Sequence, residues 1–292
     1  MDIKLLRYFL AVVQEENISR AAEALFITQP TLIRQMAQLE EELGVQLFER
    51  GRRLVLTDAG VALRQRAEDV VVLMDKIKAD FADRQNVAGI ISIGMGGLLA
   101  AQQILDLSEA FQRDYPQVQF RFYSDNADDI KEKLDAGLLD FGVLLEPVEM
   151  ARYDYLRFHT EERWGVLMPS ENPLAAKNAI TPQDLDGLPL MVSDRQALQK
   201  ELNHWLQAGN IQPNIVATYN LITHTAALVD SGYAYALTIE GAITLLDKNR
   251  LAFRPLFPEL AMTSVLAWKK TRADFGAAAK FLQFVKEKLQ AV

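Results

Sequence analysis

The fold of the N-terminal part is decided by residues 19–44, which read SRAAEALFITQPTLIRQMAQLEEELG. Apolar residues recur four, three and four positions apart, at Leu32, Met36, Leu39 and Leu43. This spacing places them on one buried face of a helix. Pro30 suits the first turn, because proline lacks the N–H that would be unpaired there, and Gly44 suits the C-cap. The pattern predicts a helix over residues 29–43.

Two further helices are predicted upstream. Residues 3–15 carry apolar side chains at helical spacing, at Leu5, Leu6, Phe9, Leu10 and Val13. Ser19 is the expected N-cap of a short helix over residues 20–25, whose alanines allow a close approach to a neighbouring helix. A turn without glycine follows at Phe26, Ile27 and Thr28.

Two short helices joined by a tight turn form a helix-turn-helix, and the second helix here has a polar N-terminal face. Glutamine and arginine can form bidentate hydrogen bonds with adenine and guanine edges, while threonine and isoleucine can contact thymine methyl groups. The candidate DNA-binding residues on this helix are Gln29, Pro30, Thr31, Ile33, Arg34 and Gln38. Arg20 is a candidate for contact with the DNA backbone.

Residues 47–50 and 53–56 alternate around Gly51 and Arg52 and predict a β-hairpin wing. Arg52 and Arg53 lie at its expected tip. Arginine at a wing tip can follow phosphates or enter a narrow minor groove. We therefore add both residues to the predicted DNA-binding set.

The net charge of −8 requires a local interpretation. Residues 1–66 carry nine basic and nine acidic side chains, so the excess of acid lies in the rest of the chain. A phosphate-binding face must therefore be a small patch on an acidic protein, which predicts modest non-specific affinity and a dependence on dimers.

Residues 58 to about 84 are predicted to form a long helix capped by Thr57. Its apolar stripe alternates four and three apart, at Leu63, Ala67, Val70, Met74, Ile77 and Phe81. Such a heptad seam is typical of a coiled coil, although a helix packed on its own domain has the same spacing. Because the other faces are polar, we favour dimerisation.

After residue 87 the pattern alternates between strands and helices. Strands are predicted at 90–93, 118–123, 141–145, 153–158, 163–168, 188–192, 214–219, 233–238 and 263–268, and helices at 98–113, 127–136 and 274–289. This order predicts an α/β domain with a mostly parallel sheet.

The ordered motifs resemble those of the LysR-type transcription regulators of bacteria. In the first part these are Ser19-Arg20-Ala21-Ala22, Gln29-Pro30, Glu42-Leu43-Gly44, Leu47-Phe48-Glu49-Arg50 and Leu56-Thr57-Asp58-Ala59-Gly60; in the second, Leu134 to Asp140, Asn172 to Ala175 and Leu228 to Gly232. The family usually has serine where this chain has Ile33, which either contacts a thymine methyl group or is turned inward.

The resemblance implies a winged helix-turn-helix over residues 1–57, a linker and dimerisation helix over 58–87, and an effector-binding domain over 88–292. This domain resembles the periplasmic binding proteins. It has one subdomain at about 88–160 and 265–292 and another at about 161–264, joined by two crossover strands. The resemblance further implies a dimer or tetramer on an operator, an unknown small-molecule effector in the cleft, and contact with RNA polymerase.

Ligands of open α/β sheets bind beyond the carboxyl ends of strands. Four segments fit this rule, with the candidate effector-binding residues Met95, Gly96 and Gly97; Asp125; Ser193 and Arg195; and Thr223 and Thr225. Each has a competing role. The glycines can serve turn geometry, the Asp125 segment and the threonines can cap helices, and Arg195 can pair with a surface carboxylate.

Other functions fit the sequence less well. The three histidines lack metal-ligand spacing, and no nucleophile-elbow or phosphate-loop motif is present. We expect no enzyme activity, no metal and no cofactor. Cysteine is absent, and no apolar run reaches the length of a membrane span. A solute-binding protein would need an export signal and has no use for the first eighty residues. We expect a soluble, cytoplasmic regulator. The alternative is a small-molecule-binding α/β protein, or an enzyme, with a DNA-binding domain that has lost sequence-specific regulation.

Overall fold

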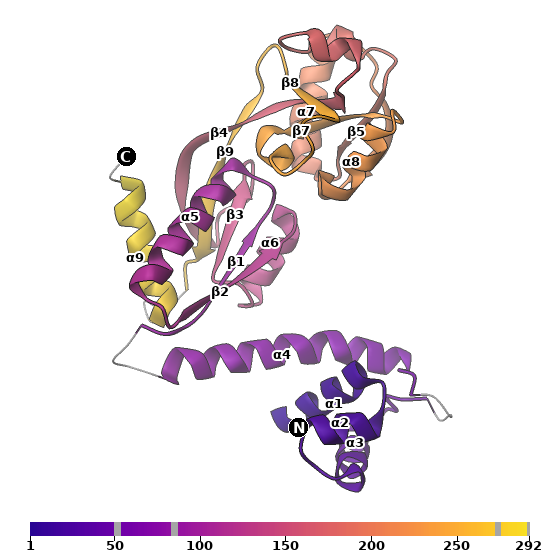
Figure 1. Ribbon diagram of the computed structural model, residues 1–292, viewed down its shortest axis with the longest axis vertical. Coiled ribbons are helices and arrows are strands. Elements are labelled where there is room, and N and C mark those ends of the chain that lie inside the picture. Colours follow the sequence, from indigo (N-terminus) through magenta and orange to yellow (C-terminus); the bar gives the residue numbers. More distant parts are fainter. Residues whose placement is uncertain (50–53, 83–86, 272–275, 291–292) are drawn as a thin grey trace. The chain divides into compact units, whose positions relative to one another are not determined.

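The structure is a computed structural model that describes residues 1–49, 54–82, 87–271 and 276–290 (Figure 1). It divides into two compact units, Met1–Phe81 and Ala82–Val292, here called the N-terminal and C-terminal units. Each unit is described by itself.

The N-terminal unit contains the helices α1 (Ile3–Glu15), α2 (Ile18–Ala24), α3 (Gln29–Leu43) and α4 (Asp58–Ala82). Helices α1, α2 and α3 pack against one another in pairs. Their core is formed by fully buried side chains such as Leu5, Phe9, Leu32 and Leu39. The predicted bounds of α1 and α3 are confirmed.

Helix α2 begins earlier than predicted. Asn17 is its N-cap, and the side-chain oxygen of Asn17 accepts a hydrogen bond from the backbone N–H of Arg20 at 3.0 Å. The prediction of Ser19 as the cap is wrong, because asparagine two residues upstream takes that role and Ser19 lies inside the helix. The turn into α3 places Phe26 in the left-handed region at φ 55°, and Gly44 ends α3 at φ 71°.

The base of the predicted wing is present. Phe48 and Leu56 form an isolated antiparallel bridge, and the N–H of Glu49 donates to the carbonyl oxygen of Val55 at 2.8 Å. One oxygen of Glu40 accepts from the N–H groups of Leu47 and Phe48, which ties the wing to α3. The predicted arginine tip at residues 50–53 lies outside the described residues.

Helix α4 uses its apolar stripe in two ways. The hydroxyl of Thr57 accepts from the N–H of Gly60 at 3.1 Å, as predicted for the cap. Ala67 is 1% exposed within the core of the N-terminal unit, so its assignment to a dimer seam is wrong; its small side chain packs in its own unit. Leu63 packs on the same core, whereas Val70 and Ile77 remain exposed.

Two predicted seam positions remain, Met74 and Phe81. Met74 is half-buried, and the side chain of Phe81 lies outside the described residues. An ion pair between Arg7 and Asp75 joins α1 to the same stretch of α4.

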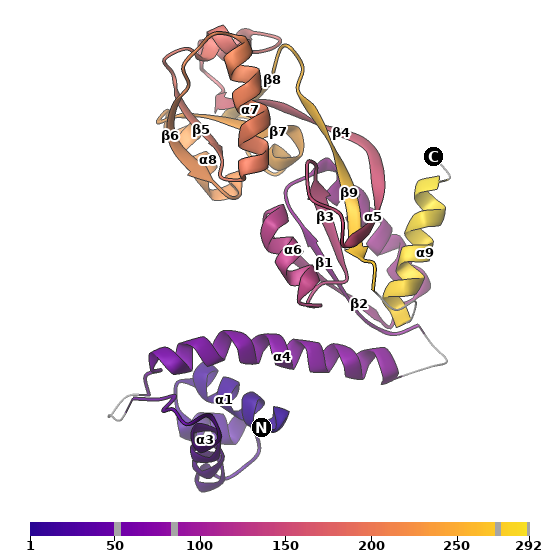
Figure 2. The ribbon, with the colours of Figure 1, turned by 180° about the vertical axis from the view of Figure 1, so that it is seen from behind.

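The C-terminal unit has one sheet in the order β2-β1-β3-β9-β4-β7-β5-β6, with β8 also paired to β4. Its strands are β1 (Gly89–Met95), β2 (Val118–Ser124), β3 (Phe141–Leu145), β4 (Tyr153–Pro169), β5 (Pro189–Ser193), β6 (Asn214–Tyr219), β7 (Tyr235–Ile239), β8 (Leu251–Pro255) and β9 (Ala261–Lys269). We call β1, β2 and β3 with their helices lobe I, and β5 to β8 with theirs lobe II. Strands β4 and β9 connect the lobes (Figure 2).

Helices cover both faces of each lobe. In lobe I, α5 (Leu99–Asp114) and α9 (Gly276–Gln290) share one apolar core, and α6 (Ala127–Asp135) packs on the other face. In lobe II, α7 (Gln196–Ala208) and α8 (Ile222–Asp230) lie on opposite faces. Short 3-10 helices add Pro173–Ala176, Pro182–Leu185 and η3 (Glu240–Ile243). The expected return of the last helix to the first lobe is confirmed, since α9 contacts β1 and α5.

Two features of the sheet correct the sequence prediction. Residues 153–158 and 163–168 belong to one strand, β4, which carries a register shift between Arg157 and Glu161. The sheet is parallel only among β1, β2 and β3 and among β5, β6 and β7; the pairs with β4 and β9 are antiparallel. The prediction of a mostly parallel sheet therefore holds only in the outer parts of the lobes. None of the helices in the described ranges is both long and apolar enough to cross a bilayer.

Candidate DNA-binding surface and effector pocket

The N-terminal part of α3 presents the polar surface that the sequence predicts. Exposed side chains are Gln29, Pro30, Ile33, Arg34 and Gln38, and Thr31 is half-buried. Arg34 forms no ion pair within the described part of the chain, so its guanidinium is available to an incoming partner. Ile33 is 47% exposed, which excludes the inward orientation that the sequence left open.

Neighbouring side chains orient several of these residues. The hydroxyl of Ser19 donates to the side-chain oxygen of Gln29 at 3.2 Å, and the hydroxyls of Thr28 and Thr31 lie 2.8 Å apart. The amide of Gln38 donates to Glu42 at 3.0 Å. These hydrogen bonds hold polar groups on one face of α3 while the side chains stay accessible.

Arginine residues outside α3 differ in what they contact. Arg20 is exposed, donates to the carbonyl oxygen of Glu15, and places its Nε 3.6 Å from the carboxylate of Glu15. This pairing fixes the guanidinium at the end of α1, beside α2. Arg52 and Arg53, the predicted wing-tip residues, lie outside the described residues.

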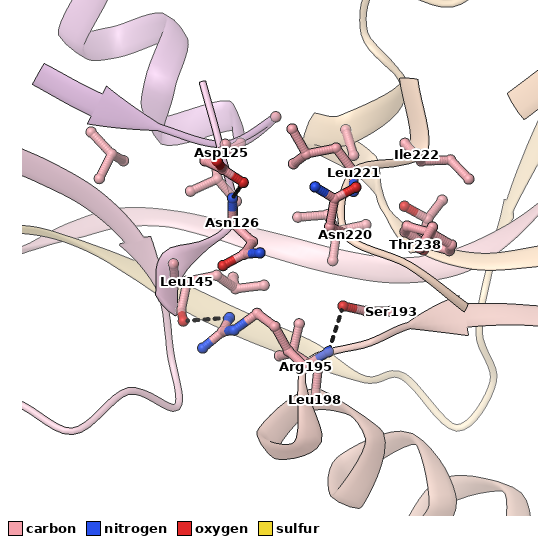
Figure 3. A pocket seen from close by; sticks show the side chains of 18 of the residues that line it. Asp125, Asn126, Leu145, Ser193, Arg195, Leu198, Asn220, Leu221, Ile222 and Thr238 are labelled. Atoms are coloured by element: carbon pink, nitrogen blue, oxygen red, sulfur yellow. Dashed lines mark hydrogen bonds between the residues drawn. The ribbon is translucent and has the colours of Figure 1, made fainter. Parts of the chain in front are cut away.

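A pocket opens between the two lobes of the C-terminal unit. It encloses about 570 Å³ of space that protein atoms do not fill, its mouth included. Its walls come from the starts of α5, α6, α7 and α8 and from the strands that precede them. In Figure 3, Asp125 and Asn126 of lobe I lie on one side, and Asn220, Leu221 and Ile222 of lobe II on the other.

The structure brings together five of the predicted effector-binding residues, namely Gly96, Gly97, Asp125, Ser193 and Arg195. Met95 does not line the pocket; it packs in the apolar core of the C-terminal unit. Thr223 lies exposed on α8, away from the lining. Thr225 donates back to carbonyl oxygens of Leu221 and Ile222 at the start of its own helix. The assignment of Met95, Thr223 and Thr225 to the pocket lining is therefore wrong.

Several lining residues were missed by the sequence analysis, namely Leu98, Asn126, Ala127, Val143, Leu145, Trp164, Leu198, Tyr219, Asn220, Leu221, Ile222, Thr238, Ile239 and Ala242. Asn126 and Asn220 lie in two of the segments that the rule about strand ends selected, but the prediction named Asp125, Thr223 and Thr225 there. Trp164 and Thr238 lie inside strands whose neighbours are far away in sequence, and no local pattern marks them.

Arg195 is a buried cation in this pocket. Its side chain is 6% exposed, yet it pairs with the exposed carboxylate of Asp128, so the competing role of pairing with a surface carboxylate is also met. Nη1 donates to the carbonyl oxygen of Leu145 at 3.4 Å (Figure 3). Nη2 donates to that of Pro147 at 3.3 Å, and both carbonyl groups belong to lobe I. Nε has no hydrogen-bond partner in the described part of the chain, and lies 3.6 Å from a carboxylate oxygen of Asp128. Burial lowers the pKa of Arg195 although Asp128 opposes the shift.

Glu162 is a buried anion behind the pocket. It lies in β4, is 0% exposed, and accepts hydrogen bonds from the N–H groups of Leu99 and Ala100 at the start of α5 and of Gly241 in η3. Burial raises the pKa of Glu162 despite these three hydrogen bonds. The carboxylate thus joins the first turn of a lobe I helix to η3 of lobe II. Sequence analysis missed it, since nothing local distinguishes it from Glu161.

The contact around Glu162 is tight. A Cβ atom added to Gly241 would lie 2.3 Å from the backbone nitrogen of Leu99 and 2.6 Å from the Glu162 carboxylate. One added to Gly97 would lie 2.9 Å from Cα of Ala242. Glycine at these positions is therefore required by the close approach of α5 to η3.

Residues 3–61 match the family model described as the bacterial regulatory helix-turn-helix protein, lysR family, and residues 84–290 match the LysR substrate binding domain. The chain belongs to the LysR family of transcriptional regulators. It therefore carries the DNA-binding and effector-binding domains of that family, as the sequence motifs predicted.

Relatives and solved structures cover the full chain. The Hca operon transcriptional activator HcaR of Escherichia coli (strain K12) is 32% identical over 100% of this chain and 99% of its own. The uncharacterized HTH-type transcriptional regulator YybE of Bacillus subtilis (strain 168) is 28% identical over 98% of both chains.

Among solved structures, the LysR family transcriptional regulator CbnR aligns with a TM-score of 0.78 at 22% identity over 99% of both chains. Full-length CbnR complexed with its target DNA aligns with a TM-score of 0.76 at 22% identity, over 98% of this chain and 99% of that one. These likenesses confirm the predicted fold, a winged helix-turn-helix with a long helix followed by a two-lobed α/β domain.

Proposed function

We propose that a small-molecule effector bound between the two lobes controls how a dimer of this LysR-family regulator binds its operator. The observation that carries this proposal is the pocket, whose lining comes from the helix starts of both lobes. A ligand that contacts both lobes stabilises one relative placement of the lobes over another, and this difference in free energy is what a switch requires.

In this proposal residues 1–57 bind DNA, 58–87 pair the subunits, and 88–292 bind the effector, with lobes at about 88–160 and 265–292 and at about 161–264. Gln29, Thr31, Ile33 and Arg34 read base edges; Arg20, Arg52 and Arg53 contact the backbone. Support comes from the exposure of the α3 residues and from the guanidinium of Arg34, which forms no ion pair with the residues that the structure describes.

Dimerisation through α4 is supported by Val70 and Ile77, which are 42% and 54% exposed and lie seven residues apart. Two apolar side chains at that spacing fall on one stripe of a helix, where a second copy of α4 can cover them. A dimer, or a tetramer built from two dimers, presents recognition helices to successive major grooves.

We assign the chain no catalytic step, in line with the regulators it resembles. Its action on bacterial DNA would take place in the cytoplasm, where altered DNA bending changes contact with RNA polymerase.

The experiment is selection of bound fragments from genomic DNA by the full chain, followed by footprinting. The expected footprint covers two half-sites separated by about 10 base pairs or a multiple of that spacing. Fragments without a shared sequence, or a single half-site, would contradict the proposal.

A further inference from the structure

The start of α5 is already occupied by a carboxylate of the chain itself. Helix N-termini attract anions because their first N–H groups lack partners within the helix. In α5 the N–H groups of Leu99 and Ala100 both donate to Glu162, since the N-cap residue Leu98 has no side-chain oxygen that could accept from them. An anionic ligand in the pocket would therefore meet satisfied donors and a like charge at this end.

Arg195, in contrast, has a positive charge that the chain compensates incompletely. A buried charge is stable only when it is paired and hydrogen-bonded. The two carbonyl contacts of Arg195 are long, and its Nε has no hydrogen-bond partner among the described residues. Its nearest carboxylate, on Asp128, is 3.6 Å away and 66% exposed, so water weakens the pairing.

The other charged side chain in the lining is Asp125, and its oxygens are engaged. One accepts from the hydroxyl of Tyr123 at 2.9 Å and the other from the N–H of Asn126 at 2.8 Å. Burial and this hydrogen bond raise the pKa of Tyr123 to about 12, so its hydroxyl remains a donor. Burial and the nearby Asp125 also raise the pKa of Asp129. Negative charge is therefore concentrated at the start of α6, where Asp128 approaches Arg195, and within the described lining the guanidinium is the group that can balance the charge of a ligand anion.

Apolar side chains form much of the remaining lining, including Leu98, Val143, Trp164, Leu198 and Ile222. Such walls favour burial of an apolar body and offer few partners for further polar groups.

We infer that the pocket takes a small, largely apolar carboxylic acid whose carboxylate pairs with Arg195 and whose apolar body extends along Leu198, Ile222 and Trp164. The inference rests on the proposed function, because it names the chemical class of the effector. A carboxylate can accept two parallel N–H groups from a guanidinium, and would supply the hydrogen bond that Nε lacks.

The test is calorimetric titration of the purified full chain, without DNA, at constant ionic strength. The probes are benzoate and hexanoate, each compared with its primary amide, benzamide or hexanamide, which has nearly the same shape and no charge. At least one carboxylate is expected to bind at least about tenfold more tightly than its amide, a factor typical of one charge-assisted hydrogen-bonded pair.

Substitutions test which residue causes the tighter binding of the carboxylate than of its amide. Arg195→Gln should remove it, whereas Arg113→Gln, which deletes the same charge from an exposed site on α5, should leave it unchanged. Glu162→Gln should not strengthen carboxylate binding, because Arg195 is the anchor. Marked strengthening in this variant would instead place the ligand carboxylate at the start of α5.

The inference is overturned if amides bind as tightly as carboxylates, if folded Arg195→Gln keeps the preference, or if none of the four probes binds. The comparison of acid with amide uses the unchanged protein, so it stands even where Arg195→Gln does not fold. DNA footprinting on the same preparation separates the two claims. A selective footprint without carboxylate binding removes the inference alone, and carboxylate binding that never changes the footprint removes the proposed effector control.

Discussion

The DNA-binding surface and the effector pocket differ in how far they expose an arginine side chain to water. On α3 Arg34 is exposed, forms no ion pair in the described part of the chain, and lies among exposed polar side chains. In the pocket Arg195 is 7% exposed and is surrounded by carbonyl groups and apolar walls. We expect both side chains to bind an anion, Arg34 in water and Arg195, which already lies 3.6 Å from Asp128, in a medium of low dielectric constant.

This difference bears on what each site can achieve. Exposed cations gain little from any single phosphate and are screened by salt, so a surface like that of α3 depends on several contacts and on a second subunit. A buried cation interacts strongly with one ligand charge, because little water competes for it. One guanidinium can therefore orient a small effector, whereas reading DNA needs a row of side chains.

The largest effect that separates the two regions is expected from Phe9→Ala. Phe9 is fully buried in the core of the N-terminal unit, and its loss should reduce the stability of that unit by about 3–5 kcal/mol. Calorimetric unfolding of the full chain should show one transition moved to lower temperature. DNA binding should be lost, whereas carboxylate binding should be kept. The control is Ile33→Ala, at an exposed position, which should leave the unfolding curve nearly unchanged. A Phe9→Ala curve like that of the control would contradict the proposed core.

Arg34→Ala should act on specificity. Loss of a bidentate contact to a guanine should cost about 1–3 kcal/mol on the operator and much less on random DNA. Competition titrations at one salt concentration measure both values. Arg113→Ala provides the matched control, since it removes an equal charge from the C-terminal unit. Equal weakening on operator and random DNA would mean that Arg34 contacts only the backbone.

Arg52→Ala should act on salt dependence. If Arg52 contacts a phosphate, its loss should weaken binding to all sequences alike and reduce the slope of log affinity against log salt by about one. The measurement is the operator affinity over a range of salt concentrations, repeated with random DNA. A loss confined to the operator would instead make Arg52 a reader of bases or of groove width.

The smallest effect is expected from Glu162→Gln, and it depends on pH. The folded-state pKa of Glu162 is raised above its usual 4.5, so the folded protein binds this proton more tightly than the unfolded chain. The stability linked to this group is therefore present below pH 4.5 and is lost as the pH rises through the folded-state pKa. Glutamine keeps a hydrogen-bond acceptor without the charge, so the melting temperature of the variant relative to the wild type should rise between acidic and neutral pH. If the difference in melting temperature between variant and wild type stays constant with pH, burial of the ionised Glu162 carboxylate does not reduce stability.

The sequence predicts the N-terminal unit better than the pocket, for physical reasons. The bounds of α1 and α3 follow from apolar spacing and end residues, which are local properties. The cap of α2 was predicted at Ser19 but lies at Asn17; both residue types cap helices well, and apolar spacing does not distinguish them.

The C-terminal unit depends on contacts between distant residues. Strand β8 was missed because it pairs with β4 more than eighty residues earlier, and its sequence alone has a weak strand signal. Glu162 accepts from Gly241, 79 positions away, and Arg195 reaches Leu145, 50 positions away. No local pattern predicts that these charges are buried. The rule about strand ends nevertheless placed Gly96, Asp125, Ser193 and Arg195 at one pocket.

The most direct test of a sequence-reading regulator is titration of the full chain with DNA from its own upstream region. The comparison is a shuffled fragment of the same length and composition at matched salt. Tighter, salt-sensitive binding to the upstream DNA, with selectivity that Arg34→Ala reduces, is the predicted result. Equal binding of both fragments by the wild-type protein, with and without a bound carboxylate, would contradict it.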